Sequence, residues 1–212
     1  MLALAAMASV EAILAGSSHV VIRVYDGATI DEATRADAIR TAAVVVAEAG
    51  VRADWHDCTD STTGGHCDRP RDTRGLIVRL MPTFHSSLIA PRGAVETRHS
   101  PDASGLILGW AVLDSSSGAG ALATIFMDRV EAIVSRTNVS PALLLGRAIA
   151  HEVGHLLLGT STHSRSGLMR GVWTDEELAL DRPADWLFAS SDRNRLGAAT
   201  QPTPNLARYE TD

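Results

Sequence analysis

The sequence predicts one α+β domain of α/β-like character, with a sheet of about five strands and two long helices. Its 212 residues are 45% apolar and 21% charged, which is typical of a globular chain with one core. Residues 19–27 (HVVIRVYDG) form an apolar, β-branched run, and apolar residues then recur at helical spacing up to Gly50. Thr29 and Glu32 have the spacing of a capping box, so this helix is expected to begin near Thr29. A strand followed by a helix favours parallel pairing with the next strand.

Four later segments have the pattern of strands. They are residues 51–58 (VRADWHDC), 75–82 (GLIVRLMP), 105–114 (GLILGWAVLD) and 121–130 (ALATIFMDRV). Prolines and glycines interrupt residues 83–105, which we interpret as a long loop.

The clearest element is a helix over residues 141–158. Ser140 is a favourable N-cap, Pro141 suits the first helical position, and the helical pattern continues to Gly159, a typical C-terminal glycine. Beyond residue 175 the sequence predicts one or two short helices around Pro183. Residues 191–212 are expected to form a polar tail with little to bury.

The net charge bears on the partners of the protein, and the first residues bear on its location. A formal net charge of −6 provides no basic patch for phosphates, so nucleic acid is not an expected partner. Residues 1–17 are rich in Leu and Ala, and Ala15 and Gly16 could serve as a cleavage site. This favours a signal peptide before a main domain over residues 18–190. The alternatives are a helix packed on the domain and a membrane anchor, for which the run is short.

The two cysteines, Cys58 and Cys67, flank a polar segment that is typical of a flexible loop. Exported proteins often close such loops with a disulfide, and we predict that these two residues form one. His56 and His66 lie beside them, so a second metal site is the alternative interpretation.

The stretch HEVGH at residues 151–155 carries the chemistry. On a helix, His151 and His155 lie on one face, one turn apart, so both imidazoles can reach one ion. Glu152 is turned away from that ion but is close enough to accept a proton from water bound to it. Zinc lowers the pKa of such water, and the glutamate then acts as general base. Catalytic zinc needs a third protein ligand, and His163 follows a short loop after Gly159.

This order of residues resembles the signature of the metzincin zinc peptidases, most of all the matrixin-like members. HEVGH, Gly159, His163 with the following serine, and SGLM at residues 166–169 follow the family order. The resemblance implies zinc ligation by His151, His155 and His163, general-base action by Glu152, and a supporting turn at Met169. Here Gly159 is four and His163 eight residues after His155, so the third-ligand loop is two residues longer than the usual pattern.

The resemblance also implies a fold. Metzincin-like catalytic domains have a mixed, roughly five-stranded twisted sheet, a backing helix and an active-site helix. Their edge strand pairs with an extended substrate, and residues 105–113 are the expected edge strand. His85, His99 and Asp102 fall in the long loop and are expected to be solvent-facing; the alternative is a structural ion, since some matrixins bind additional metals there.

The expected function is that of a secreted or cell-envelope zinc metallopeptidase, an endopeptidase with one catalytic Zn²⁺ and a peptide or protein substrate. The protein is assumed to be a monomer without a stable membrane span. A gluzincin-type site would instead take Glu176 as the third ligand, although Thr174 and Glu177 there also have capping-box spacing. Two further alternatives are a non-catalytic zinc-binding protein with a peptidase-like fold and a structural domain without metal.

Overall fold

The computed structural model describes residues 19–59, 65, 67, 75–83, 94–96, 107–114 and 119–199. The expected signal peptide, residues 1–17, lies outside the described residues, as do His66, His85, His99 and Asp102. Among the helices of the described part, none combines the length and the apolar character that a membrane crossing requires.

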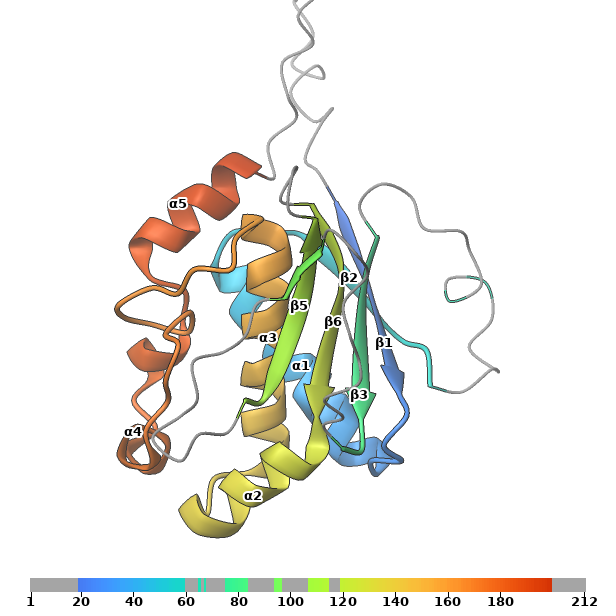
Figure 1. Cartoon of the computed structure of the whole chain (residues 1–212), viewed down its shortest axis with the longest axis vertical. Helices are drawn as coiled ribbons and strands as arrows, with labels where there is room; N and C mark the ends of the chain where they lie inside the picture. Colours follow the sequence, from blue (N-terminus) through green and yellow to red (C-terminus); the bar gives the residue numbers. More distant parts are fainter. Residues whose placement is uncertain are drawn as a thin grey trace, which may run out of the picture.

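The described elements up to Phe126 are strands, interrupted by one helix, and the elements after it are helices (Figure 1). The strands are β1 (Val20–Asp26), β2 (Ala53–Asp57), β3 (Gly75–Met81), β4 (Ala94–Glu96), β5 (Gly109–Asp114) and β6 (Gly120–Phe126). The helices are α1 (Glu32–Glu48), α2 (Met127–Thr137), α3 (Pro141–Leu158), α4 (Asp175–Leu180), the 3-10 helix η3 (Pro183–Trp186) and α5 (Ser190–Ala199).

The described strands form one six-stranded sheet in the order β2-β1-β3-β6-β5-β4. Strands β1, β2, β3 and β6 are parallel, whereas β5 pairs antiparallel with both β6 and β4. Helices α1 and α3 pack against each other, and α3 also contacts β5 and β6 (Figure 1). The predicted α+β class with a mixed sheet is confirmed, with one strand more than the roughly five expected.

The additional strand, β4, changes the edge of the sheet. It has three residues, Ala94–Glu96, and falls inside the segment that was expected to be a loop. A strand this short is below the length at which alternation can be recognised in a sequence. Because β4 pairs with the outer side of β5, the prediction that residues 105–113 form the edge strand is wrong.

Two helix starts also differ from the prediction. Thr29 has a φ of 60° and is not the N-cap of α1. Asp31 is the cap, and its side chain accepts a hydrogen bond from the backbone N–H of Thr34 at 3.0 Å. Residues 127–130 belong to helix α2 and not to the preceding strand, because Val130 and Ile133 are buried at helical spacing.

The core lies between the parallel strands and the two long helices. The fully buried strand residues include Ile22, Val24, Val78, Leu80 and Ile125, and the fully buried helix residues include Ala38, Ala42, Leu145 and Ile149. Gly146 lets α1 and α3 approach closely, because a Cβ at this position would lie 2.6 Å from Cβ of Thr41. A packed interior at this separation has no room for larger residues at the crossing point.

The expected polar tail is helical over its first part. Helix α5 covers Ser190–Ala199 and packs against α3. Leu196 is fully buried and Asp192 is only 3% exposed. The sequence has no apolar stripe in this segment, so periodicity could not identify a helix that tertiary contacts hold in place.

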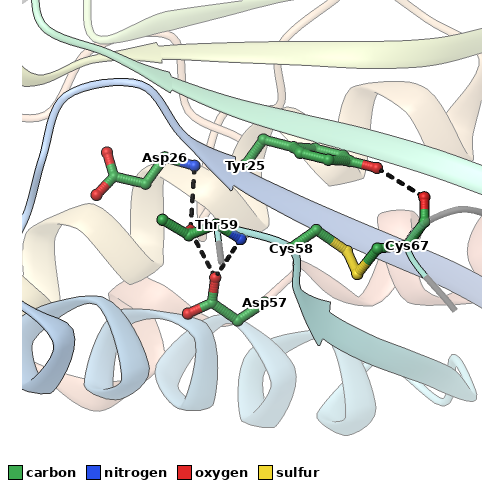
Figure 2. Close-up of a disulfide and its surroundings, with 6 residues drawn as sticks. All are labelled: Tyr25, Asp26, Asp57, Cys58, Thr59 and Cys67. Carbon is green, nitrogen blue, oxygen red and sulfur yellow. Dashed lines mark hydrogen bonds between the residues drawn. A yellow bond between two sulfur atoms is a disulfide. The ribbon is translucent and has the colours of Figure 1, made fainter. Parts of the chain in front are cut away.

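The predicted disulfide between Cys58 and Cys67 is confirmed (Figure 2). Cys58 directly follows β2, and its backbone N–H donates to the carbonyl of Val24 at 2.7 Å. The hydroxyl of Tyr25 donates to the carbonyl of Cys67 at 3.3 Å. These contacts attach both ends of the closed loop to β1.

A partly buried ion-pair network lies beside the disulfide, at the carboxyl ends of β1 and β2, and Figure 2 shows its two aspartates, Asp26 and Asp57. Arg35 of α1 donates from Nε to Asp57 at 2.7 Å and from Nη1 to Asp26 at 3.3 Å. Partial burial acts to raise the pKa of the Asp57 carboxyl, but hydrogen bonds from Thr59 and Arg35 outweigh it and hold this pKa below its ordinary value. Asp57 therefore stabilises the fold in its ionised form.

We expect Asp57→Asn to lower the free energy of unfolding at pH 7. Since the pKa of Asp57 is depressed in the folded state, its contribution is complete above the unfolded pKa of about 3.9 and is lost as the pH falls through the folded value. The difference between variant and wild type should therefore shrink in acid. Urea unfolding at a series of pH values measures this difference in the free energy of unfolding. A difference that stays constant from pH 7 into acid would contradict the prediction.

Candidate metal centre

Helix α3 holds two buried histidines on one face. His151 and His155 are both fully buried, and their Nε2 atoms are 3.0 Å apart. The loop after α3 brings His163 to the same place, with its ring centroid 5.4 Å from that of His151 and 4.9 Å from that of His155. One ligand atom from each of the three residues lies within 4.8 Å of the other two. The structure thus brings together the three histidines that the sequence singled out.

Two backbone carbonyls determine which nitrogen each helical histidine presents. Nδ1 of His151 lies 2.8 Å from the carbonyl oxygen of Leu168, and Nδ1 of His155 lies 2.8 Å from that of Thr160. A carbonyl only accepts, so each Nδ1 carries the proton and each Nε2 presents a lone pair. Two lone pairs that face each other at 3.0 Å repel unless they share a cation. The donor set of three imidazoles therefore fits a zinc ion.

The turn after α3 delivers the third histidine. Gly159 ends the helix in the left-handed conformation, at φ 60° and ψ 35°, which glycine adopts without a steric penalty. The backbone N–H of Thr160 then donates to the carbonyl of His155 at 3.3 Å. Further along, the N–H of Ser164 donates to the carbonyl of Met169 at 2.8 Å. The first bond attaches the start of the longer loop to α3, and the second attaches its later part to the segment at Met169.

Met169 lies against α3 and belongs to the packing around the centre. Its side chain is 1% exposed. A Cβ at Gly154 would lie 2.6 Å from the sulfur of Met169 and 2.7 Å from the ring of Phe188, so the glycine makes room for both.

Glu152 points toward the sheet beside the histidine cluster. It is fully buried, and a Cβ at Gly109 of β5 would lie 3.2 Å from its Cγ. The same Cβ would lie 2.6 Å from the carbonyl oxygen of Thr124. Sequence reasoning did not single out Gly109, although a glycine inside an apolar strand pattern, as in GLILGWAVLD, often marks a close approach.

Two residues after Met169, Gly171 and Trp173, pack against histidines of the cluster. A Cβ at Gly171 would lie 3.1 Å from the Cγ of His163, so this position too requires a small residue. The indole N–H of Trp173 donates to the carbonyl of Leu168 at 3.3 Å, and its ring centroid lies 5.6 Å from that of His151. Leu168 thus accepts hydrogen bonds from both a histidine and a tryptophan.

A buried arginine extends this packing one turn before His151. Arg147 is 4% exposed, contacts Asp181 by a hydrogen-bonded ion pair, and lies with its guanidinium 4.0 Å from the ring centroid of Trp186. The rings of Trp186 and Trp173 are 5.3 Å apart. Burial lowers the pKa of Arg147, and the contact with Asp181 opposes this only in part.

Glu176, the alternative third ligand, is exposed on α4. Its neighbour Glu177 forms the predicted capping box with Thr174. Within the residues that the structure describes, the group able to hold a metal consists of His151, His155 and His163, without Glu176. The geometry favours the three-histidine arrangement over the gluzincin-type one.

Comparison with known proteins supports the fold. No family model and no curated protein matches the sequence. Among solved structures, a zinc-dependent peptidase from Methanocorpusculum labreanum superimposes with a TM-score of 0.51 at 14% identity, over 82% of this chain and 99% of its own. Archaemetzincin (amzA) from Methanopyrus kandleri gives a TM-score of 0.47 at 14% identity, over 86% of this chain and 96% of its own, and no conclusion rests on it. The chain thus shares the fold of a zinc-dependent peptidase.

We expect Gly154→Ala to destabilise the protein by about 1–3 kcal/mol, the usual cost of overpacking a core. The added methyl group would meet the sulfur of Met169 at 2.6 Å and the ring of Phe188 at 2.7 Å, and both would have to move. Chemical denaturation measures the loss. Gly197→Ala is a matched control, since nothing lies within 4 Å of a Cβ there. Equal stabilities of the two variants would argue against the close packing of Met169 on α3.

Proposed function

We propose that the protein is a zinc-dependent metallopeptidase that cleaves peptide bonds within a chain. The observation that carries this proposal is the cluster of His151, His155 and His163, whose ligand atoms lie within 4.8 Å of one another. The cluster occurs on a fold shared with a zinc-dependent peptidase. The buried Glu152, adjacent to His151, supplies the acid–base group that hydrolysis needs.

Each side chain has a role in this proposal. His151, His155 and His163 would hold the ion. When bound, zinc supplies Lewis-acid chemistry, polarising the scissile carbonyl and lowering the pKa of water. Glu152 accepts a proton from the attacking water and delivers it to the leaving amine nitrogen. Burial of Glu152 excludes competing solvent and strengthens its electrostatic interactions.

The metzincin assignment, and the matrixin-like subtype within it, are part of the proposal. The packing of Met169 on Gly154 supports a methionine-bearing turn below the histidines. Among the described strands, β2 and β4 are at the two edges of the sheet, and β4 is the candidate to pair with an extended peptide substrate. Strand β4 pairs with β5, and Gly109 of β5 lies against Glu152. A peptide paired with β4 would therefore lie near the strand that contacts the candidate metal centre.

An extracytoplasmic location is also proposed. Its support is the disulfide between Cys58 and Cys67, because disulfides persist mainly in oxidising compartments.

Metal content tests the ligand set. We expect the wild-type protein to hold about one zinc ion per chain. Mutation of a residue that only orients a ligand typically lowers metal affinity by roughly 10–100-fold. Because His163 would be a ligand itself, His163→Ala should lower the zinc affinity by more than this. Glu176→Ala, on the exposed face of α4, should leave it unchanged. Mass spectrometry and chelator competition measure both quantities. Zinc binding that depends on Glu176 and not on His163 would move the protein to the gluzincin-type site.

Turnover of a peptide library tests the role of Glu152. Glutamine keeps the shape of this side chain but cannot accept the proton, so Glu152→Gln should lower the cleavage rate by about 10²–10⁴-fold with zinc content unchanged. Mass analysis of the products shows whether cleavage is internal. If wild type binds zinc but cleaves no peptide, the protein is a non-catalytic zinc-binding protein and the peptidase proposal fails.

A further inference from the structure

The segment that carries His163 is attached to the rest of the protein at Ser164. Residues 160–166 connect α3 to the turn at Met169, and the described attachments in their second half involve Ser164. Its N–H donates to the carbonyl of Met169 at 2.8 Å, and it forms an isolated bridge with Arg170. Because Ser164 directly follows His163, the placement of Ser164 limits where the histidine ring can lie.

The side chain of Ser164 makes a second attachment, to helix α5. Its Oγ lies 2.8 Å from both carboxylate oxygens of Asp192, so the hydroxyl can donate to either one. Asp192 is 3% exposed. It lies in the first turn of α5, where the helix dipole favours a carboxylate. A buried carboxylate that accepts this bond would be costly to leave without it.

Helix α5 is itself held on α3. Leu196 is fully buried in the same core, and the guanidinium of Arg195 donates to the carbonyl of Leu158 at 3.4 Å. The segment before α5 contributes Phe188, whose ring lies where a Cβ at Gly154 would be 2.7 Å away. Asp192 therefore has a defined position relative to the helix that carries His151 and His155.

We propose that Asp192 is a positioning residue for the metal centre: through Ser164 it holds His163 facing His151 and His155. This inference rests on the proposed zinc site and extends it by assigning α5 a part in that site. The loop after Gly159 is long and has little regular structure, so fixing His163 without an anchor would cost more conformational entropy when the ion binds. The anchor lowers that cost before binding.

Zinc affinity, measured by chelator competition on the full chain, tests the proposal. Asp192→Ala and Ser164→Ala should each weaken binding by about 10–100-fold, as expected for residues that orient a ligand. Asp192→Asn keeps a carbonyl oxygen that can accept from Ser164, so its affinity should stay near that of wild type. Asn194→Ala, exposed on the same helix, is the matched control and should have no effect.

A double-mutant cycle separates positioning from general stabilisation. If Asp192 acts through His163, then adding Asp192→Ala to His163→Ala should not weaken zinc binding further. A role confined to holding α5 in place would lower the affinity by the same factor in both backgrounds. Unfolding of the metal-free variants shows whether each one folds.

Unchanged affinity in Asp192→Ala, or an equal loss in the His163→Ala background, would overturn this inference while leaving the zinc site intact. If Asp192→Ala does not fold, the zinc affinity of Ser164→Ala tests the inference instead. An affinity equal to that of wild type would then overturn it. Wild-type protein that binds no zinc would overturn the proposed function as well, which distinguishes the two failures.

Discussion

Burial of helix α3 on all sides is the constraint on which the rest of the structure depends. Every residue from Leu144 to Leu156 is buried, although a helix at the surface of a sheet normally keeps one face in water. Close approach on each side requires a small residue: Gly146 faces α1, and Gly154 faces Met169 and Phe188. On the sheet side the small residue is supplied by β5, where Gly109 faces Glu152.

A helix buried in this way must satisfy its polar side chains within the protein, and this requirement produces the site. His151 and His155 each use one nitrogen on a backbone carbonyl, which directs the other nitrogen into the cluster. Arg147, one turn earlier, reaches Asp181 and stacks on Trp186. The carbonyls that accept these bonds come from the segments that follow the helix, so the second half of the chain completes the polar contacts of α3.

Much of the fold follows from local pattern. Strands β1 and β3 and helix α3 were predictable because their apolar runs, caps and stops lie within a few residues of one another. Strand β4 was not predictable, because three residues are too few to show an alternating pattern and the strand is defined by its pairing with β5. Helix α5 was not predictable either, because Leu196 is a lone large apolar residue in a polar segment. Its burial comes from contacts with distant residues.

The same division applies to the candidate centre. The sequence by itself determined that His151 and His155 share a helix face with Glu152 next to them, because a spacing of four residues on a helix is a local property. Only the tertiary structure decided that His163, and not Glu176, completes the cluster. Ser164, which follows His163, makes contacts with Met169 and with Asp192, and Asp192 lies 28 residues further along the chain. Loop length by itself does not specify them.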